Sequence, residues 1–140
     1  MLGVDPGEKY IGLAVSDESG LVARPLATLR HSARATDADR IVAAAREQGA
    51  ATIVVGYALN ADGLPGPQAR HSEKLAEALR QRTPLPVVLY DESFSSQHAA
   101  EVLRATGKPR KLQREQIHAA AAASLLQSYL DGLARETPPG

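Results

Sequence analysis

The chain has 140 residues, 44% of them hydrophobic and 23% charged, which is typical of one soluble domain with a substantial core. Its 16 basic and 16 acidic residues cancel, so the overall charge gives no indication of a nucleic-acid partner. The absence of cysteine excludes disulfides and thiolate metal sites, and no apolar run approaches the roughly 18 residues that cross a bilayer. We therefore expect a cytoplasmic protein without a membrane partner.

The amino terminus predicts a β-hairpin whose first strand ends in an acid. An apolar run places Asp5 at the end of a buried strand, and Pro6 and Gly7 then turn the chain. Alternating apolar residues over 11–15 predict a half-buried return strand. Because Gly7 and Gly12 carry no Cβ, we expect a ligand to approach the backbone there. Asp5 could thus hold a metal ion or a phosphate, or it could merely cap the turn.

Three further segments have the composition of strands. Residues 21–29 predict a third strand, and Pro25 within it indicates an edge position. Residues 52–56 and 87–90 are short apolar runs rich in β-branched side chains, which are typical of central parallel strands.

Four segments have the periodicity or the capping residues of helices. The first begins at Thr36, with Asp39 as the acid at the third position, and ends at Gly49. The second has its apolar positions over 72–79 and ends before Pro84. The third is expected from Ser95 to Gly107. The last is expected from Arg114 to Leu133 and contains a run of alanines that would let it lie close to a sheet.

This element order predicts an α/β fold with a mixed five-stranded sheet and helices on both faces. We expect a single domain over residues 1–135, a frayed tail over 136–140, and no signal peptide before the first strand. Ligands of such sheets gather at the carboxyl ends of the parallel strands, where Asp5, the loop from Tyr57 and the pair Asp91–Glu92 would meet.

Four groups of residues resemble the YqgF/RuvX family in their order and spacing, over nearly the whole chain. They are Gly3–Gly7 with Gly12–Asp17, Ile53–Gly56 with Leu59–Gly63, Asp91–Glu92, and Ala119–Leu130. Members of this family are described as pre-16S ribosomal RNA nucleases and as Holliday-junction-resolvase-like proteins. The resemblance implies a ribonuclease-H-like fold with strand order 3-2-1-4-5 and an antiparallel second strand.

The resemblance also implies which residues bind metal and take part in catalysis. Asp5 and Glu92 match two family acids that would hold divalent metal, although Asp91 could replace Glu92. His118 stands at the position of the third family acid, so we expect it to act as the third catalytic residue and ligand. Imidazole suits Mn²⁺ better than Mg²⁺, so of these two cofactors Mn²⁺ is favoured.

Three alternatives for His118 remain open. It could act as an acid or base near its working pKa, it could be replaced as a ligand by Glu115 one turn earlier, or it could simply border the apolar helix face. Two further departures from the family bear on activity rather than fold: Ser93 replaces an arginine, and Tyr57-Ala58 replaces Leu-Pro.

A basic run from Arg104 to Arg114 contains no acid and leads directly into the helix that carries His118. We expect it to contact phosphates without reading sequence, although it could also be an ordinary solvated loop. The candidate nucleic-acid-binding residues are Lys108, Arg110, Lys111 and Arg114 from this run, with Lys9, Asn60 and Arg70 from the rim of the same site.

The leading hypothesis is a metal-dependent nuclease for structured nucleic acid, with the 5′ end of pre-16S ribosomal RNA as substrate and branched DNA as the second choice. A homodimer would suit a junction resolvase. Two other classes remain: a nucleic-acid-binding protein that has lost a metal ligand, and a nucleotide-binding phosphotransferase of the actin-like type, suggested by Asp5–Gly7.

Overall fold

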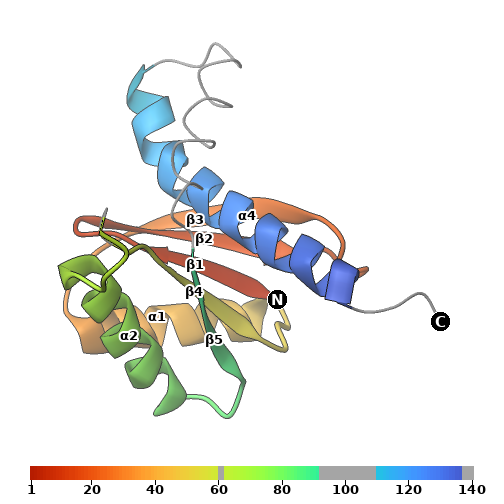
Figure 1. Cartoon of the computed structure of the whole chain (residues 1–140), viewed down its shortest axis with the longest axis horizontal. Coiled ribbons are helices and arrows are strands. Elements are labelled where there is room, and N and C mark those ends of the chain that lie inside the picture. The colour runs from red at the N-terminus through yellow and green to blue at the C-terminus, as the bar shows by residue number, and fades with distance from the viewer. Residues whose placement is uncertain (60–61, 92–109, 137–140) are drawn as a thin grey trace.

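The computed structural model describes residues 1–59, 62–91 and 110–136, with the side chains of the last segment described from 116 to 134. One mixed sheet has the strand order β3-β2-β1-β4-β5 (Figure 1). β2 runs antiparallel to β1 and β3, whereas β4 is parallel to β1 and β5. The expected order and the edge position of the strand with Pro25 are confirmed. The strands are β1 (Leu2–Pro6), β2 (Tyr10–Ser16), β3 (Ala23–Arg30), β4 (Ile53–Tyr57) and β5 (Val87–Asp91).

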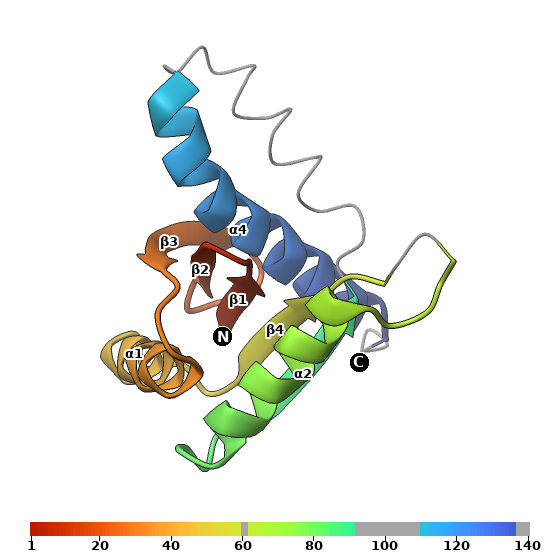
Figure 2. The ribbon, with the colours of Figure 1, turned by 90° about the vertical axis from the view of Figure 1, so that its left-hand side faces the viewer.

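Helices cover both faces of the sheet, as expected (Figure 2). α1 (Arg34–Glu47) and α2 (Pro67–Arg80) pack on one face, and α4 (Arg110–Glu136) crosses the other. The buried core is divided accordingly into one cluster with α1 and α2 and a second cluster with α4. The helix expected from Ser95 to Gly107 lies outside the described residues. None of the described helices is long and apolar enough to cross a bilayer.

β2 is buried on both faces, which corrects the expectation of a half-buried strand. Ile11 and Leu13 belong to the cluster with α1 and α2, whereas Ala14 packs under α4 together with Leu125 and Leu126. The alternation of large and small residues in β2 therefore distinguishes a side with room for large side chains from a side where a helix lies very close.

α1 begins at Arg34 and not at Thr36, so the expected start is wrong by two residues. The acidic residue in its first turn is Asp37, whose Oδ1 accepts a hydrogen bond from the backbone N–H of Ser32 at 3.0 Å. Asp39 instead forms an ion pair at the surface with Arg82, whose Nε lies 2.9 Å from its Oδ1. The sequence pattern therefore identified the helix but placed its start two residues too late.

The other two described helices are longer than expected. α2 begins at Pro67, within the expected loop, because proline is well suited to the first position of a helix. α4 begins at Arg110 and ends at Glu136, the first residue of the expected tail. The second half of the basic run is consequently the first turns of α4 and not a loop.

Candidate functional site

α4 contacts the sheet where the strands carry glycine. A Cβ on Gly12 would lie 1.8 Å from the carbonyl oxygen of His118, and one on Gly3 would lie 2.9 Å from a leucine Cβ of α4. The helix can lie this close only because neither strand residue has a side chain. The expectation of ligand room at Gly12 is therefore wrong, since α4 fills it. The space at Gly7 is filled as well, because a Cβ there would lie 2.6 Å from the carbonyl oxygen of Tyr10 across the β1–β2 turn.

Asp5 lies on the same face of β1 as the contact with α4. It is the register partner of Gly12 across the β1–β2 pair, and Gly3, two residues earlier, lies under α4. Only 9% of Asp5 is exposed. The backbone of α4 at His118 packs directly against Gly12. The first strand and the last helix therefore bring Asp5 and His118 close together at the carboxyl end of β1.

The imidazole of His118 is partly buried in this place, and its charge state responds to two neighbours. Burial lowers its pKa below the ordinary value of 6.5, and the carboxylate of Asp5 opposes that change by favouring the charged ring. The ring of Tyr10 lies against it, with 5.1 Å between ring centroids and a tilt of 31°. His118 is therefore predominantly neutral near pH 7, with one nitrogen able to accept a proton or bind a cation.

A carboxylate and a neutral imidazole form a donor pair that suits a divalent cation, and Mn²⁺ accepts both oxygen and nitrogen ligands. Among the described side chains, in 1–59, 62–91 and 116–134, no group of three His, Asp or Glu residues is placed to hold a metal ion. Asp5 and His118 are thus the two members of the predicted site that the described structure brings together. Glu92, the third member, lies outside the described residues.

Asp91, the alternative to Glu92, lies on the wrong face of the sheet. The register pairs Gly56 with Tyr90 and Tyr57 with Asp91. Tyr90 packs with the α4 cluster, and its hydroxyl oxygen lies 2.6 Å from Oγ of Ser128 on α4. Successive strand residues point to opposite faces, so Asp91 faces the α2 side and cannot approach Asp5 without a shift in register.

The predicted nucleic-acid-binding residues fall into three groups. Lys9, in the β1–β2 turn, and Arg70, in the first turns of α2, are exposed at the same edge of the sheet as Asp5. The backbone of α4 carries three more of them before His118, and nothing is described of their side chains. These are Arg110, Lys111 and Arg114. Asn60 and Lys108 lie outside the described residues.

Two residues at this edge escaped the sequence interpretation. Tyr10, 38% exposed, covers the ring of His118. Gln68 joins three elements: its Oε1 accepts a hydrogen bond from Ala58 N–H at 2.8 Å, and its Nε2 donates to the Pro6 carbonyl at 3.2 Å. It thereby fixes the start of α2 against the ends of β1 and β4. A polar residue directly after a helix-starting proline was the available signal for Gln68, whereas Tyr10 gave none.

A comparison with family models assigns the chain to a protein family. The RuvX family model, described as Holliday junction resolvase, matches residues 1–132. The chain belongs to the RuvX family. The family suggested by the sequence is therefore confirmed.

Similar proteins align with this chain over almost their full length. A "Putative pre-16S rRNA nuclease" of Geobacillus kaustophilus is 46% identical over 132 residues, covering 93% of this chain and 96% of the relative. A protein of the same name from Anaeromyxobacter sp. strain Fw109-5 is 43% identical over 131 residues, covering 94% and 96%.

Solved structures confirm the ribonuclease-H-like fold. Thermus thermophilus RuvC in complex with a Holliday junction substrate superposes with a TM-score of 0.58 at 18% identity, covering 95% of this chain and 94% of RuvC. The Fowlpox virus resolvase, in complex with Holliday junction DNA, superposes with a TM-score of 0.58 at 12% identity, covering 95% and 99%. At such low identity these likenesses establish the fold alone.

Proposed function

We propose that this RuvX protein is a divalent-metal-dependent nuclease that hydrolyses phosphodiester bonds in structured nucleic acid, with the 5′ end of pre-16S ribosomal RNA as its substrate. The observation that carries the proposal is the meeting of Asp5 and His118 at the carboxyl end of β1, where the α4 backbone rests on Gly12. The names of the relatives supply the reaction and the substrate.

Asp5 and His118 are the proposed metal-binding groups, with Glu92 as the third. A divalent ion bound there would make a coordinated water more acidic and would stabilise charge on the phosphate. Asp5 contributes a negative charge and oxygen donors from a nearly buried position. His118 contributes a neutral nitrogen, because burial disfavours its protonated form. This nitrogen is the reason for proposing that Mn²⁺ supports the reaction better than Mg²⁺.

The substrate would lie across the edge of the sheet, with its backbone beside the first turns of α4. Arg110, Lys111 and Arg114 lead along that helix to His118, and Lys9 and Arg70 stand at the same edge. Contacts of this kind position a phosphate backbone and depend on salt but do not select a base sequence. A pre-ribosomal RNA substrate would place the protein in the cytoplasm.

The decisive experiment compares two aspartates on opposite faces of the sheet. Asp5→Asn should reduce cleavage of a 5′-extended 16S ribosomal RNA precursor by at least about 100-fold, because it removes an anionic group from the reacting centre. Asp91→Asn is the matched control and should cleave at the rate of the unmodified protein, since Asp91 faces α2. Equal loss in both variants, or full activity of Asp5→Asn, would refute the proposed site.

Two further functions use the same edge and are separated by simple assays. A junction resolvase, for which a homodimer would provide two cutting centres, would cleave a four-way DNA junction in preference to the RNA precursor. A binding protein without nuclease activity is favoured by the replacement of the third family acid with His118. It would retain nucleic acid in EDTA and cleave neither substrate in Mg²⁺ or Mn²⁺.

A further inference from the structure

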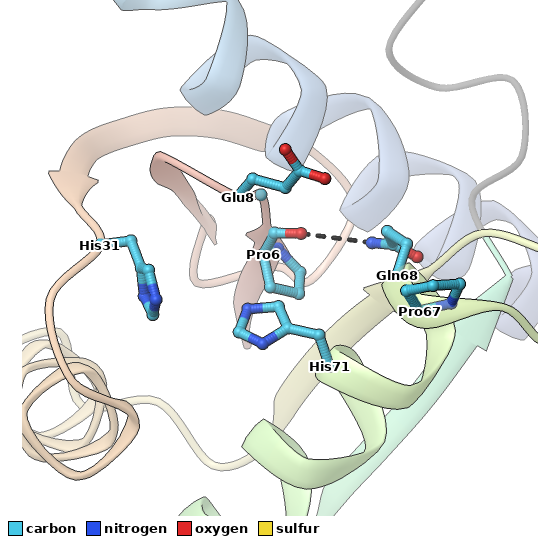
Figure 3. Close-up of a pocket in the computed structure, with 7 residues that line it drawn as sticks. Pro6, Glu8, His31, Pro67, Gln68 and His71 are labelled. Atoms are coloured by element: carbon cyan, nitrogen blue, oxygen red, sulfur yellow. Dashed lines mark hydrogen bonds between the residues drawn. The ribbon is translucent and has the colours of Figure 1, made fainter.

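A pocket lies behind the β1–β2 turn, on the face of the sheet that carries α2 and not on the face of α4 (Figure 3). Its volume is about 280 Å³. It is bounded by the β1–β2 turn, by the residue that follows β3, and by the first turns of α2. The lining residues are Pro6, Gly7, Glu8, His31, Pro67, Gln68 and His71.

One wall of the pocket is an imidazole held in a fixed orientation. Nδ1 of His31 is bonded to Oδ2 of Asp37, a carboxylate that is only 1% exposed. The other oxygen of Asp37 accepts the N–H of Ser32. Because Nδ1 is engaged with Asp37, Nε2 is the His31 nitrogen left for a further partner.

The opposite wall is His71, whose ring stands edge-on to that of His31 with 5.5 Å between centroids. Its Nε2 is buried and has no hydrogen-bond partner among the described residues. Burial is the largest cause of its lowered pKa; the charges of His31 and Arg34 lower it further, and Asp37 opposes them. A buried, unpaired nitrogen costs free energy unless a bound group satisfies it.

The surroundings of the two imidazoles favour an anion over a cation. The first turn of α2 has no acidic residue and Gly66 provides no side-chain cap, so the partial positive charge of the helix start is not compensated. The charge of Arg34 also acts on His71. The carboxylate of Glu8 points away from both rings in Figure 3. A cation would lack ligands, since the described residues contain no group of three suitable donors.

We propose that this pocket binds a phosphate group, with His71 Nε2 as its hydrogen-bond donor, His31 as the second imidazole and the start of α2 as the electrostatic support. If the protein has the proposed nuclease function, the bound group is a backbone phosphate of the substrate, different from the phosphate at Asp5. The nucleic-acid strand would then cross the β1–β2 turn, with one phosphate on the α4 side of the sheet and another on the α2 side.

The test follows the histidine ring signals by NMR while inorganic phosphate is added to the full-length protein. Phosphate should raise the pKa of His71, because the anion stabilises the imidazolium, and chloride at equal ionic strength should not. His71→Phe retains an aromatic ring but has no ring nitrogen, so it should weaken phosphate binding by about tenfold. Lys74→Gln, which removes a positive charge from the exposed side of the same helix, should change it less than about twofold. The proposal would be overturned if phosphate left the pKa of His71 unchanged, or if both substitutions weakened phosphate binding equally.

Two ligands identify the source of the phosphate. A single-stranded oligonucleotide in EDTA should shift the His71 signals at lower concentration than a mononucleotide does. The reverse order would keep the phosphate pocket and overturn its link to the substrate backbone. The pocket and the nuclease hypothesis fail separately: an active nuclease with an unresponsive His71 overturns the pocket alone, whereas a phosphate-binding protein without cleavage overturns the nuclease alone.

Discussion

Replacing Gly12 with alanine tests the contact on which the proposed site depends. The added Cβ would lie 1.8 Å from the His118 carbonyl oxygen, 2.3 Å from its carbonyl carbon and 2.9 Å from the Ala119 nitrogen. All three are backbone atoms of α4, so no side-chain rotation can relieve the overlap. Ordinary contact begins near 3.4 Å, so α4 must move away from β2 by about 1.6 Å (3.4 minus 1.8).

We expect this displacement to destabilise the protein by about 2–3 kcal/mol, near the upper end for overpacking, and to lower Tm by about 6–12 °C. Activity should fall by about 100-fold even where the variant is folded, because the move separates His118 from Asp5. The assays are urea unfolding and cleavage of the RNA precursor at a temperature well below the Tm of the variant.

Two other glycines calibrate the result. Gly3→Ala should be less harmful, since its Cβ meets a side-chain atom at 2.9 Å and a carbonyl oxygen at 3.2 Å. Gly132→Ala, on α4 itself, meets nothing within 4 Å and should be neutral or stabilise the helix by up to about 1 kcal/mol. The reasoning is refuted if Gly12→Ala matches Gly132→Ala in both stability and activity.

Three further predictions concern charge and hydrogen bonding. Asp5→Asn should lower the pKa of His118 further, because the carboxylate now raises it; an NMR titration showing a rise would contradict their proximity. Tyr10→Ala should raise the pKa of His118 by admitting water, whereas Tyr10→Phe should leave it unchanged in the same titration. Gln68→Ala removes the hydrogen-bond partner of the Ala58 amide, which follows β4, and of the Pro6 carbonyl in β1. It should cost about 1–3 kcal/mol in urea unfolding, with Arg70→Ala as an exposed control on the same helix.

The pH dependence of stability follows from the same shifts. His71 and His118 have lowered pKa values in the folded protein. Near and below the unperturbed histidine pKa of about 6.5, the unfolded chain therefore binds more protons than the folded protein. Their contribution to the free energy of unfolding should therefore decrease as the pH falls from 7 through that value. His71→Phe should flatten this slope in urea unfolding measured between pH 5 and 7.5; an unchanged slope would contradict the shift.

Patterns local in sequence were sufficient to predict the order of the described elements. The alternation in β2, the β-branched run of β4 and the proline at the β3 edge each depend on neighbours a few residues apart. The errors occur where a distant contact decides. Gly12 is a helix contact and not a ligand gap because α4 returns from the far end of the chain.

Candidate site residues could be proposed from the sequence, but their geometry could not. Asp5 and His118 could be named from a resemblance, yet their proximity depends on how α4 crosses the sheet. Choosing a face for Asp91 required the register between β4 and β5, which no sequence pattern specifies. The proposed phosphate pocket joins His31, Asp37 and His71 from two helices and a loop, and none of these residues formed a recognisable motif.

The contact of α4 with Gly12 also determines when a working enzyme can exist during synthesis. Every strand, with Asp5 among the first residues, precedes α4 in the chain. A nascent chain can therefore assemble the sheet on the ribosome while His118 is still to be translated, and domains near their amino termini generally fold first. The proposed centre would therefore be complete only once α4 has folded against Gly12.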